Sequence, residues 1–520
     1  LMENGVFTDT SPYVTHAGQH MRQANKNSLD WLAENSPWHK MEKYKTNKPY
    51  CWRHKVPLLV RPSRQWYLNL DSGVRTRALK MLDTVTFVPL SGKARLADAV
   101  AKRPDWCLSR QRTWGVPLAL FVSKKDGSLH PNASRLMQSV AELVETKGLE
   151  AWWLSHDSDW VDADEYMRVP DVLDVWFDSG VCRYVTAFSN MVPDVVLEGH
   201  DQHRGWFQSS LLVAAALGNE APYKKVVTHG FVVDQSGAKL SKSKGGDKKQ
   251  TNSKVPSWGD LPADVVRVWA ANSACYSDKT WGLDELTLAK AMYDKFRNSV
   301  RFALSNLSDL PMYDVYDTNL WWHQDRWAVT RAHETKQNVL ALFNDAKFEA
   351  AVAELHMFAN ETLSKTYYAM LKDRLYCGAE HNTERRSAQQ ALHTGLCLYS
   401  DALEVLAPNL VRDAQSYLPE HLKKKVELVN FTKENDALPY KLRQCVASLW
   451  APFSDKDGGS VQVAGVRLNK TKDWAYSKEE MLEWLGVSEL NDTPTTMATV
   501  DGVDVEVYRK EGVVCPRCRG

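Results

Sequence analysis

The chain has 520 residues, of which 44% are hydrophobic and 25% charged, a globular composition that leaves no room for extensive disorder. Lysine and arginine total 65 against 64 aspartate and glutamate, so the net charge of +1 excludes global charge as a source of nucleic-acid binding. The longest apolar run, residues 211–218, is far shorter than the ~20 residues of a membrane-spanning helix, so we expect no membrane partner.

The chain length exceeds a single hydrophobic core and predicts about three domains. Residues 1–50 are polar and turn-rich, lack sustained periodicity, and read as the tail of another domain. Residues 51–285 alternate short apolar runs, such as PLALFV and KKVVTHGFVV, with helical stretches. This pattern predicts an α/β region of strands and crossover helices around a largely parallel sheet.

The pattern changes in the second half of the chain. In residues 286–425 the apolar positions Phe348, Val352 and Leu355 recur at helical spacing, which predicts an all-helical bundle. Residues 426–520 mix the helical run KEEMLEWLG with the strand-like VDVEVYRKEGVV, and we expect a small mixed segment there.

Nine cysteines are scattered along the chain, an odd number that fits free thiols in a reducing, intracellular compartment. The chain opens with Leu1 and has no targeting segment, and its last residues stop just after a CxxC pair, Cys515 and Cys518. We therefore expect both ends to be cut.

Residues 192–234 have the pattern of one βαβ unit. Residues 194–197 predict a strand, residues 202–217 a helix and residues 225–228 the next strand. Ligands of such units bind outside the carboxyl ends of the strands. The residues that follow each strand are therefore candidates for a binding site.

Glu198 and Gly199 follow the first of these strands, and His229 and Gly230 follow the second. A carboxylate at this place could hold the ammonium group of a ligand, and glycine allows close approach of the backbone. His229 taken alone is more often a packed, hydrogen-bonded histidine, and only its position favours ligand binding.

Asp201 and Gln202 stand near the predicted helix start, where they could bind hydroxyl or main-chain groups. The alternative for Asp201 is a helix cap that satisfies the first amides of the helix. Trp206, on the same helix, could line a pocket or simply pack in the core.

In DVLDVWFDSG, residues 171–180, Trp176 stands beside Asp174 and Asp178. Trp176 could form the wall of a pocket for an apolar side chain, with core packing as the alternative. The two carboxylates also suggest acid and base catalysis.

The segment GAKLSKSKGGDKKQ, residues 237–250, places Lys239, Lys242 and Lys244 among glycines and serines just after the strand-like FVVD. A lysine-rich loop of this kind is usually a solvated surface. Its neighbours must decide whether it has another role.

Seven motifs occur in the order typical of isoleucyl-tRNA synthetases, and the chain resembles that family. They are CWRHKVP at 51–57, RQWYLNLD at 64–71, RPDWCLSRQRTWGVP at 103–117, DVLDVWFDSG at 171–180, LEGHDQHRGWF at 197–207, THGFVVD at 228–234 and KLSKS at 239–243. The likeness is dense over residues 51–245. It thins through the helical region, where RFALSNL, DRWAV and KDRLYCG resemble the anticodon-binding domain of the family. The related valine enzymes usually depart from the WRHK, WFDSG and EGxDQHRGWF patterns.

The resemblance implies that KLSKS is the KMSKS loop of class I synthetases, whose lysines contact the phosphates of ATP. Lys239 and Lys242 would then be catalytic, because they stabilise the charge that develops as the amino-acid carboxylate attacks the α-phosphate. Ser241 and Ser243 would share in binding ATP.

The resemblance also implies a role for each of the other candidates, and the idea of paired acid and base aspartates is then set aside. Glu198, Gly199, Asp201 and Gln202 would hold the aminoacyl-adenylate, Trp176 and Trp206 would line the side-chain pocket, and His229, Gly230 and Phe231 would lie near the adenosine and bind ATP.

The chain departs from the family pattern in the loop and in one missing motif. Leu240 replaces the usual methionine, Gly246 stands where asparagine is common, and residues 247–260 are longer than usual. No HIGH motif is present, and its nearest likeness, HAGQH at 16–20, has glutamine in place of the second histidine. The first half of the ATP site and most of the editing site are therefore expected outside this chain, which alone is predicted to be inactive.

The domains implied by the resemblance follow the ranges given above. Residues 1–50 would end the inserted editing domain, and residues 51–285 would form the second half of a Rossmann-like catalytic domain. Residues 286–425 would bind the anticodon, and residues 426–520 would contact tRNA. Cys515 and Cys518 would form half of a zinc knuckle, which two ligands cannot close.

Two functions remain open at this point. The first is a fragment of an isoleucine-tRNA ligase that uses ATP, Mg²⁺, isoleucine and tRNA-Ile, with Zn²⁺ possible, as a monomer in the bacterial cytosol or the mitochondrial matrix. The alternative is a catalytically inactive, synthetase-like protein that grips tRNA phosphates with basic stretches such as residues 423–425.

Overall fold

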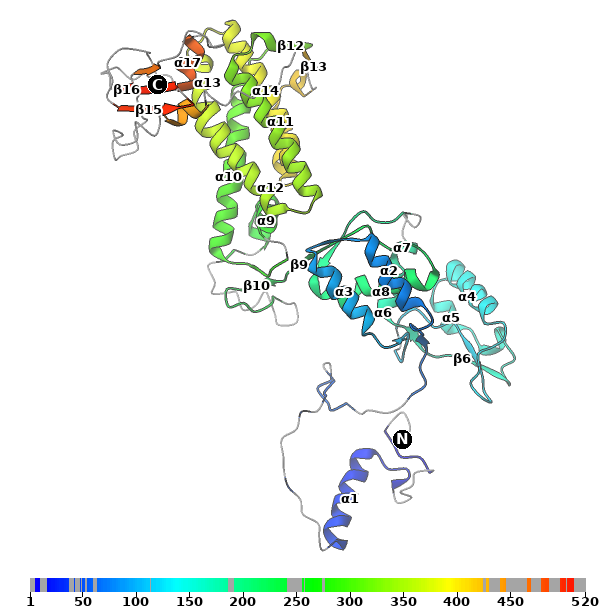
Figure 1. The fold of residues 1–520 in the computed structure, drawn as a ribbon. Helices are drawn as coiled ribbons and strands as arrows, with labels where there is room; N and C mark the ends of the chain where they lie inside the picture. Colours follow the sequence, from blue (N-terminus) through cyan, green and yellow to red (C-terminus); the bar gives the residue numbers. More distant parts are fainter. Residues whose placement is uncertain are drawn as a thin grey trace. The chain divides into compact units, whose positions relative to one another are not determined.

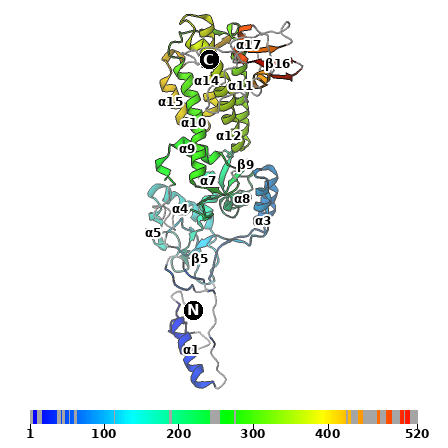
Figure 2. The ribbon, with the colours of Figure 1, turned by 90° about the vertical axis from the view of Figure 1, so that its left-hand side faces the viewer.

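The structure is a computed structural model of the whole chain (Figures 1 and 2). It describes residues 5–9, 16–36, 42, 47, 49–51, 54–58, 63–112, 114–185, 191–240, 255–256, 258–273, 276–423, 427–429, 440–445, 465–468, 478–485, 496–501 and 503–508. The chain divides into two compact units. Unit 1 comprises residues 1–76 and 103–182, and unit 2 comprises residues 77–102 and 183–520.

Unit 1 contains short strands that pair antiparallel and several helices. Its elements are α1 (Met21–Asn35), β1 (Tyr67–Leu68), β3 (Trp106–Cys107), β4 (Ser109–Arg110), β5 (Phe121–Ser123), α4 (Ala133–Lys147), α5 (Glu150–Leu154), the 3-10 helix η3 (Asp157–Asp159), β6 (Tyr166–Arg168), β7 (Val172–Leu173) and α6 (Val175–Gly180). The pairs are β1 with β3, β4 with β7 and β5 with β6. The parallel sheet predicted for residues 51–285 is therefore confined to unit 2.

The helix α1 was not expected from the sequence, because its residues are polar and only Ala24 is buried. His20 caps its first turn, with the ring nitrogen Nδ1 accepting a hydrogen bond from the backbone N–H of Arg22 at 3.2 Å. His20 is the last residue of HAGQH, so this part of the likeness to a HIGH motif serves a helix end.

The first part of unit 2 is a three-stranded parallel sheet with helices. The strand order is β2-β9-β8, and the partner strands run parallel. The elements are α2 (Val74–Met81), which begins in unit 1, η2 (Leu82–Thr84), β2 (Thr86–Val88), α3 (Ser91–Ala101), α7 (Cys182–Val185), β8 (Val196–Gly199), η4 (His200–Arg204), α8 (Trp206–Leu217), β9 (Lys225–His229), β10 (Val232–Val233), η6 (Trp258–Asp260), α9 (Ala263–Ala271) and β11 (Lys279–Thr280).

The second part of unit 2 is helical, as predicted, with α10 and α11 as its longest helices (Figure 1). The elements are α10 (Leu283–Ser305), β12 (Val315–Asp317), η7 (Thr318–Leu320), α11 (His323–Asn344), α12 (Phe348–Met357), η8 (Phe358–Tyr367), α13 (Tyr368–Tyr376), α14 (Thr383–Leu403), α15 (Pro408–Tyr417) and η9 (Glu420–Leu422). The ten residues of η8 form a π-helix, so α12, η8 and α13 make one continuous helical run. One large apolar core runs through these helices and includes the predicted Val352 and Leu355, both fully buried.

The last segment contains the predicted helix and strands. The elements are β13 (Glu427–Val429), β14 (Gly465–Leu468), α17 (Lys478–Leu485), β15 (Thr496–Val500) and β16 (Val503–Tyr508). The strands β14, β16 and β15 form an antiparallel sheet. Trp484 of α17 is buried against Trp327 of α11, with the two ring centroids 5.0 Å apart. No helix in the described part of the chain is both long and apolar enough to cross a membrane.

Candidate active site

Two neighbouring parallel strands, β8 and β9, place the predicted site residues at one edge of the sheet. Val196, Val226 and Val227 are buried and hold the two strands in the core. The register pairs Glu198 with Thr228 and Gly199 with His229. The carboxyl ends of both strands therefore lie side by side, which is where such sheets bind ligands.

The connection after β8 differs from the prediction. The strand covers 196–199 rather than 194–197, and the helix begins at Trp206 rather than at residue 202. Residues 200–204 form the 3-10 helix η4 instead, and Gly205 separates η4 from α8. The side-chain oxygen of Gln202 accepts a hydrogen bond from the backbone N–H of Trp206 at 3.0 Å. The capping role considered for Asp201 is thus taken by Gln202.

Gly199, Asp201 and Phe231 lie together at the strand ends. A Cβ atom on Gly199 would stand 2.6 Å from Oδ1 of Asp201 and 3.7 Å from the ring of Phe231. The ring of His200 lies on Phe231, with a centroid distance of 4.5 Å. Only glycine fits between the carboxylate and the aromatic ring, as expected where the backbone must leave room.

Lys239, the first lysine of KLSKS, reaches this same cluster. Its Nζ atom lies 3.3 Å from the centroid of the Phe231 ring, a cation–π contact. A tight turn carries it there, in which the Asp234 carboxylate accepts hydrogen bonds from Ser236 and from the backbone N–H of Ala238. These bonds lower the pKa of Asp234 and keep the turn acceptor charged. Lys239 itself is exposed.

The backbone from His229 to Phe231 is fixed by a segment that the sequence reasoning did not single out. A Cβ atom on Gly230 would stand 2.2 Å from backbone atoms of Ser277, so no other residue fits without a shift. The backbone N–H of Phe231 donates to the Asp278 carboxylate at 2.7 Å. The parallel pairing of β10 with β11 holds Ser277 and Asp278 in place, a long-range contact that no local motif signals.

His203 is a second residue that sequence reasoning missed. It is buried, and its Nδ1 atom lies 2.6 Å from the backbone oxygen of His200. A Cβ atom on Gly92, in the first turn of α3, would stand 3.0 Å from its Nε2 atom. Burial lowers the pKa of His203, so the ring is neutral near pH 7 and packs η4 against α3.

The other predicted site residues are not all brought together. Glu198 is exposed at the end of β8, and Trp206 is half-buried beside Phe207. Trp176 belongs to unit 1, where 40% of its surface is exposed. The remaining predicted residues lie outside the described part of the chain: Ser241, Lys242, Ser243, Cys515 and Cys518.

Asp174 is a structural anchor within unit 1. Its carboxylate is buried, accepts a hydrogen bond from Nε1 of Trp106 at 3.0 Å and pairs with Arg110 at 2.9 Å. It also caps α6 through the backbone N–H of Trp176. Partial burial, together with the nearby charge of Asp174, raises the pKa of Asp178. Since Asp174 is fully occupied by these contacts, its geometry favours positioning α6 over proton transfer.

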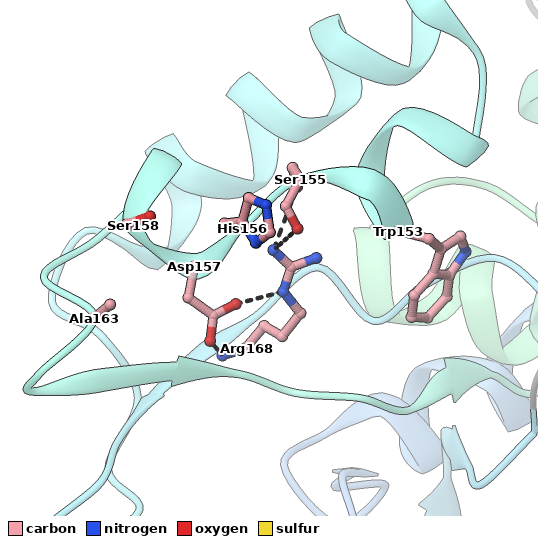
Figure 3. Close-up of a pocket in the computed structure, with 7 residues that line it drawn as sticks. All are labelled: Trp153, Ser155, His156, Asp157, Ser158, Ala163 and Arg168. Atoms are coloured by element: carbon pink, nitrogen blue, oxygen red, sulfur yellow. Dashed lines mark hydrogen bonds and ion pairs between the residues drawn. The ribbon is translucent and has the colours of Figure 1, made fainter.

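A cavity of about 520 Å³ in unit 1 was not predicted from the sequence (Figure 3). Its centre is Arg168, whose guanidinium donates to the Asp157 carboxylate and to the backbone oxygens of Trp152 and Ser155. All three nitrogens of the side chain are thereby used within the protein. We assign this arrangement to folding the loop between α5 and β6 rather than to a ligand.

No group of three or more His, Cys, Asp or Glu side chains among the described residues could hold a metal ion. The two aspartates nearest the cluster, Asp201 and Asp278, are separated in role, since Asp278 binds the backbone of Phe231. Ligands for Mg²⁺ would thus have to come from substrate phosphates and water.

Comparison with protein families places both halves of the chain. Residues 23–282 match the model described as tRNA synthetases class I (I, L, M and V), and residues 325–438 match the anticodon-binding domain of tRNA ligase.

Curated relatives include isoleucine–tRNA ligases from bacteria. The protein of Actinobacillus pleuropneumoniae serotype 5b (strain L20) is 36% identical over 571 residues, covering 100% of this chain and 58% of that protein. The protein of Coxiella burnetii (strain Dugway 5J108-111) is 42% identical over 391 residues, covering 72% of this chain and 41% of that protein. The chain therefore spans little more than half the length of the relatives it matches.

Among solved structures, methionyl-tRNA synthetase of Mycobacterium tuberculosis bound by methionyl-adenylate is similar with a TM-score of 0.46 and 12% identity. The likeness covers 71% of this chain and 65% of that one.

Proposed function

Because the chain belongs to the class I tRNA synthetases (I, L, M and V), we propose that it is part of an isoleucine–tRNA ligase. Such an enzyme joins isoleucine to ATP as isoleucyl-adenylate and then transfers the isoleucyl group to tRNA-Ile. In this proposal the strand ends of β8 and β9 form one side of the adenylate site. Residues 286–425 bind the anticodon.

The meeting of Gly199, Asp201, Phe231 and Lys239 at the ends of two parallel strands is the observation that carries this proposal. These residues come from three motifs separated in sequence, and each motif matches the isoleucyl family. The identity of 36–42% to isoleucine–tRNA ligases supports isoleucine over the other amino acids of the class.

In the first step the carboxylate of isoleucine attacks the α-phosphate of ATP, and pyrophosphate leaves. The exposed Glu198 would hold the ammonium group of isoleucine, and Gly199 would let the adenylate approach the backbone. Lys239 and Lys242 would neutralise the phosphate charge that builds up in the transition state. Trp206 and Trp176 would enclose the apolar side chain.

Lys239 would change partners during this step. It now rests on the face of Phe231, a contact that contributes about 0.5–2 kcal/mol. A charge-assisted hydrogen bond to phosphate is stronger, so ATP would draw the ammonium group from the ring. The exposed turn that carries Lys239 leaves room for this movement.

In the second step a hydroxyl group at the end of tRNA attacks the carbonyl carbon of the adenylate, and AMP leaves. The helical region would hold the tRNA, as its match to an anticodon-binding domain supports. We further propose that the enzyme acts as a monomer. Its bacterial relatives favour the bacterial cytosol over the mitochondrial matrix.

Two metal ions accompany this proposal. Mg²⁺ would enter with ATP and supply charge neutralisation at the phosphates, and none of the roles given above depends on it. Cys515 and Cys518, which lie outside the described residues, would contribute to a zinc site only with two further ligands.

Isoleucine-dependent exchange of pyrophosphate into ATP tests the proposal. We expect none with the 520-residue chain, which has no HIGH motif. A chimera that adds the uncovered part of the Actinobacillus relative should show exchange. Lys242→Ala should lower this exchange by about 10²–10³-fold, as removal of one transition-state donor does elsewhere.

Lys248→Ala is the matched control, because it removes a lysine of the same segment outside KLSKS. Exchange by the 520-residue chain alone would refute the expectation of an incomplete site. A folded chimera without exchange, or one that prefers valine, leucine or methionine, would refute the proposed reaction or its substrate.

A further inference from the structure

A groove between α10 and α15 in unit 2 has the features of a ligand site that no motif marked. The two helices pack along one another (Figure 2) and enclose a cavity of about 490 Å³. Its floor is apolar, and its lining residues are Tyr293, Arg297, Val300, Arg301, Leu304, Ser305, Leu410, Asp413, Ala414 and Tyr417. This volume lies within the range of small-molecule sites, about 300–1,000 Å³.

One face of α10 supplies a row of polar groups to the groove. Tyr293, Arg297, Arg301 and Ser305 recur every four residues, so they lie on the same side of the helix. Both arginines are exposed, and no carboxylate among the described residues lies within ion-pairing distance of either. Their charges are therefore available to a ligand.

This absence of partners is unusual for arginines of the helical region. Arg374 is held by Asp325, and Arg385 and Arg386 are both held by Asp309. The helices thus pair the arginines that serve packing and leave unpaired the two that line the groove.

The opposite wall, from α15, supplies an aromatic ring and a carboxylate. Tyr417 is 78% exposed, although tyrosine normally buries its ring. Asp413 lines the groove without pairing with Arg297 or Arg301. Arg297 and Asp413 both influence the pKa of Tyr293, which burial raises, so the charged groups face a common space.

We propose that this groove binds one strand of the tRNA, with backbone phosphates on Arg297 and Arg301 and a base or ribose against Tyr417. Guanidinium groups bind phosphate through paired hydrogen bonds, and aromatic rings stack on exposed bases. Asp413 accepts a hydrogen bond from an amino group at the edge of that base. A ligand that carries anionic, aromatic and donor groups together satisfies all three, and an RNA strand does so.

The groove is also firmly built. The buried Asp264 of α9 accepts a hydrogen bond from the backbone N–H of Leu410 at 2.8 Å, within the first turn of α15. Asp264 pairs in addition with Arg267 at 2.7 Å. The wall that carries Asp413 and Tyr417 is thus fixed at its amino end, which lowers the cost of ordering a ligand there.

The test is the binding of a fluorescent tRNA transcript with an isoleucine anticodon to the 520-residue chain, measured by anisotropy over a range of salt concentrations. We expect the double variant R297A/R301A to bind at least about tenfold more weakly and to lower the slope of log affinity against log salt by about two. Tyr417→Ala should weaken binding by roughly fivefold to a hundredfold, through loss of stacking, and Tyr417→Phe should retain most of the affinity.

Arg412→Ala is the matched control. Arg412 is exposed on α15 but does not line the groove, so its loss should leave affinity nearly unchanged. An equal loss with Arg412→Ala would overturn the inference, because general attraction would then explain binding. Polyglutamate provides a second control, and its binding with the same dependence on Arg297 and Arg301 would overturn RNA in favour of an acidic peptide.

This inference rests on the proposed function, and the outcomes separate the two. If the wild-type chain binds tRNA and R297A/R301A binds equally well, the groove is refuted while the tRNA partner stands. If the wild-type chain binds no tRNA, both are refuted. Thermal unfolding by circular dichroism checks that each variant is folded.

Discussion

The helical region and the strand ends of the sheet use charged side chains in opposite ways. In the helices, Arg374 and Asp325 are almost fully buried and joined by two hydrogen bonds of 2.7 and 2.8 Å. At the strand ends, Glu198 and Lys239 are exposed, and Lys239 rests only on an aromatic ring. The first pair fixes a fold, whereas the second set remains available for ligands that bring the opposite charge.

Arg374→Ala should break the helical side of this comparison most strongly. The substitution would leave Asp325 buried with only the Tyr367 hydroxyl and nearby backbone donors, and we expect a loss of about 3–5 kcal/mol of unfolding free energy. Urea denaturation measures it. Lys290→Ala, which removes the exposed pair with Asp294, should cost at most about 0.5 kcal/mol. Equal losses for both variants would contradict the role given to burial.

Gly230→Ala tests the strand-end side. The new methyl group would meet the backbone of Ser277 at 2.2 Å, so we expect a loss of about 1–3 kcal/mol as the backbone shifts. Urea denaturation measures the loss. Gly259→Ala is the control, since its Cβ would have nothing within 4 Å. A Gly230→Ala protein as stable as the control would show that the close approach is not required.

Asp309 allows the comparison to be examined by pH. Partial burial alone would raise its pKa, but hydrogen bonds from Arg385 and Gln389 and the charges of Arg385 and Arg386 lower it to about 2. The carboxylate therefore stabilises the fold above its unfolded pKa, about 3.9, and this contribution is lost as pH falls towards 2.

We expect Asp309→Asn to cost about 1 kcal/mol at pH 7, after allowance for screening by solvent, and much less near pH 2. Chemical denaturation at several pH values measures the difference. Asp314→Asn, which changes an exposed carboxylate in the following turn, is the control. A penalty that does not shrink below pH 4 would contradict the pairing.

Gly395→Ala should have the smallest effect, and a favourable one. Gly395 lies within α14, and a Cβ atom there would have no neighbour within 4 Å. Alanine should raise stability by up to about 1 kcal/mol, because it has the higher helix propensity. Gly378→Ala should instead lower the melting temperature, since its Cβ would stand 2.6 Å from the backbone oxygen of Arg374. Thermal unfolding of both variants measures the contrast.

Local patterns predicted much of the architecture. The apolar residues of 194–197 and 225–228 indicated β8 and β9 to within two residues, because burial dictates a local signal. The turn η4 was missed, because Gly205 and the cap from Gln202 break the helix in a way that hydrophobic pattern does not register. The polar helix α1 was missed for the same reason.

The site itself depended on contacts distant in sequence. Phe231 is positioned by Asp278, and Gly92 makes room for His203, over separations that no short motif covers. The groove between α10 and α15 joins side chains more than a hundred residues apart. Sequence reasoning found residues that a family motif names, and it missed those whose role is to support them.

The π-helix η8 has a consequence for insertions and deletions. Loss of one residue from an ordinary α-helix rotates everything beyond it by about 100° and moves buried side chains to the surface. The ten residues of η8 are already wound more loosely, with α12 before them and α13 after them. Removal of one residue could return part of this stretch to α-helical winding while the flanking faces stay in the core. Length variation should therefore be better tolerated here than in α11 or α14.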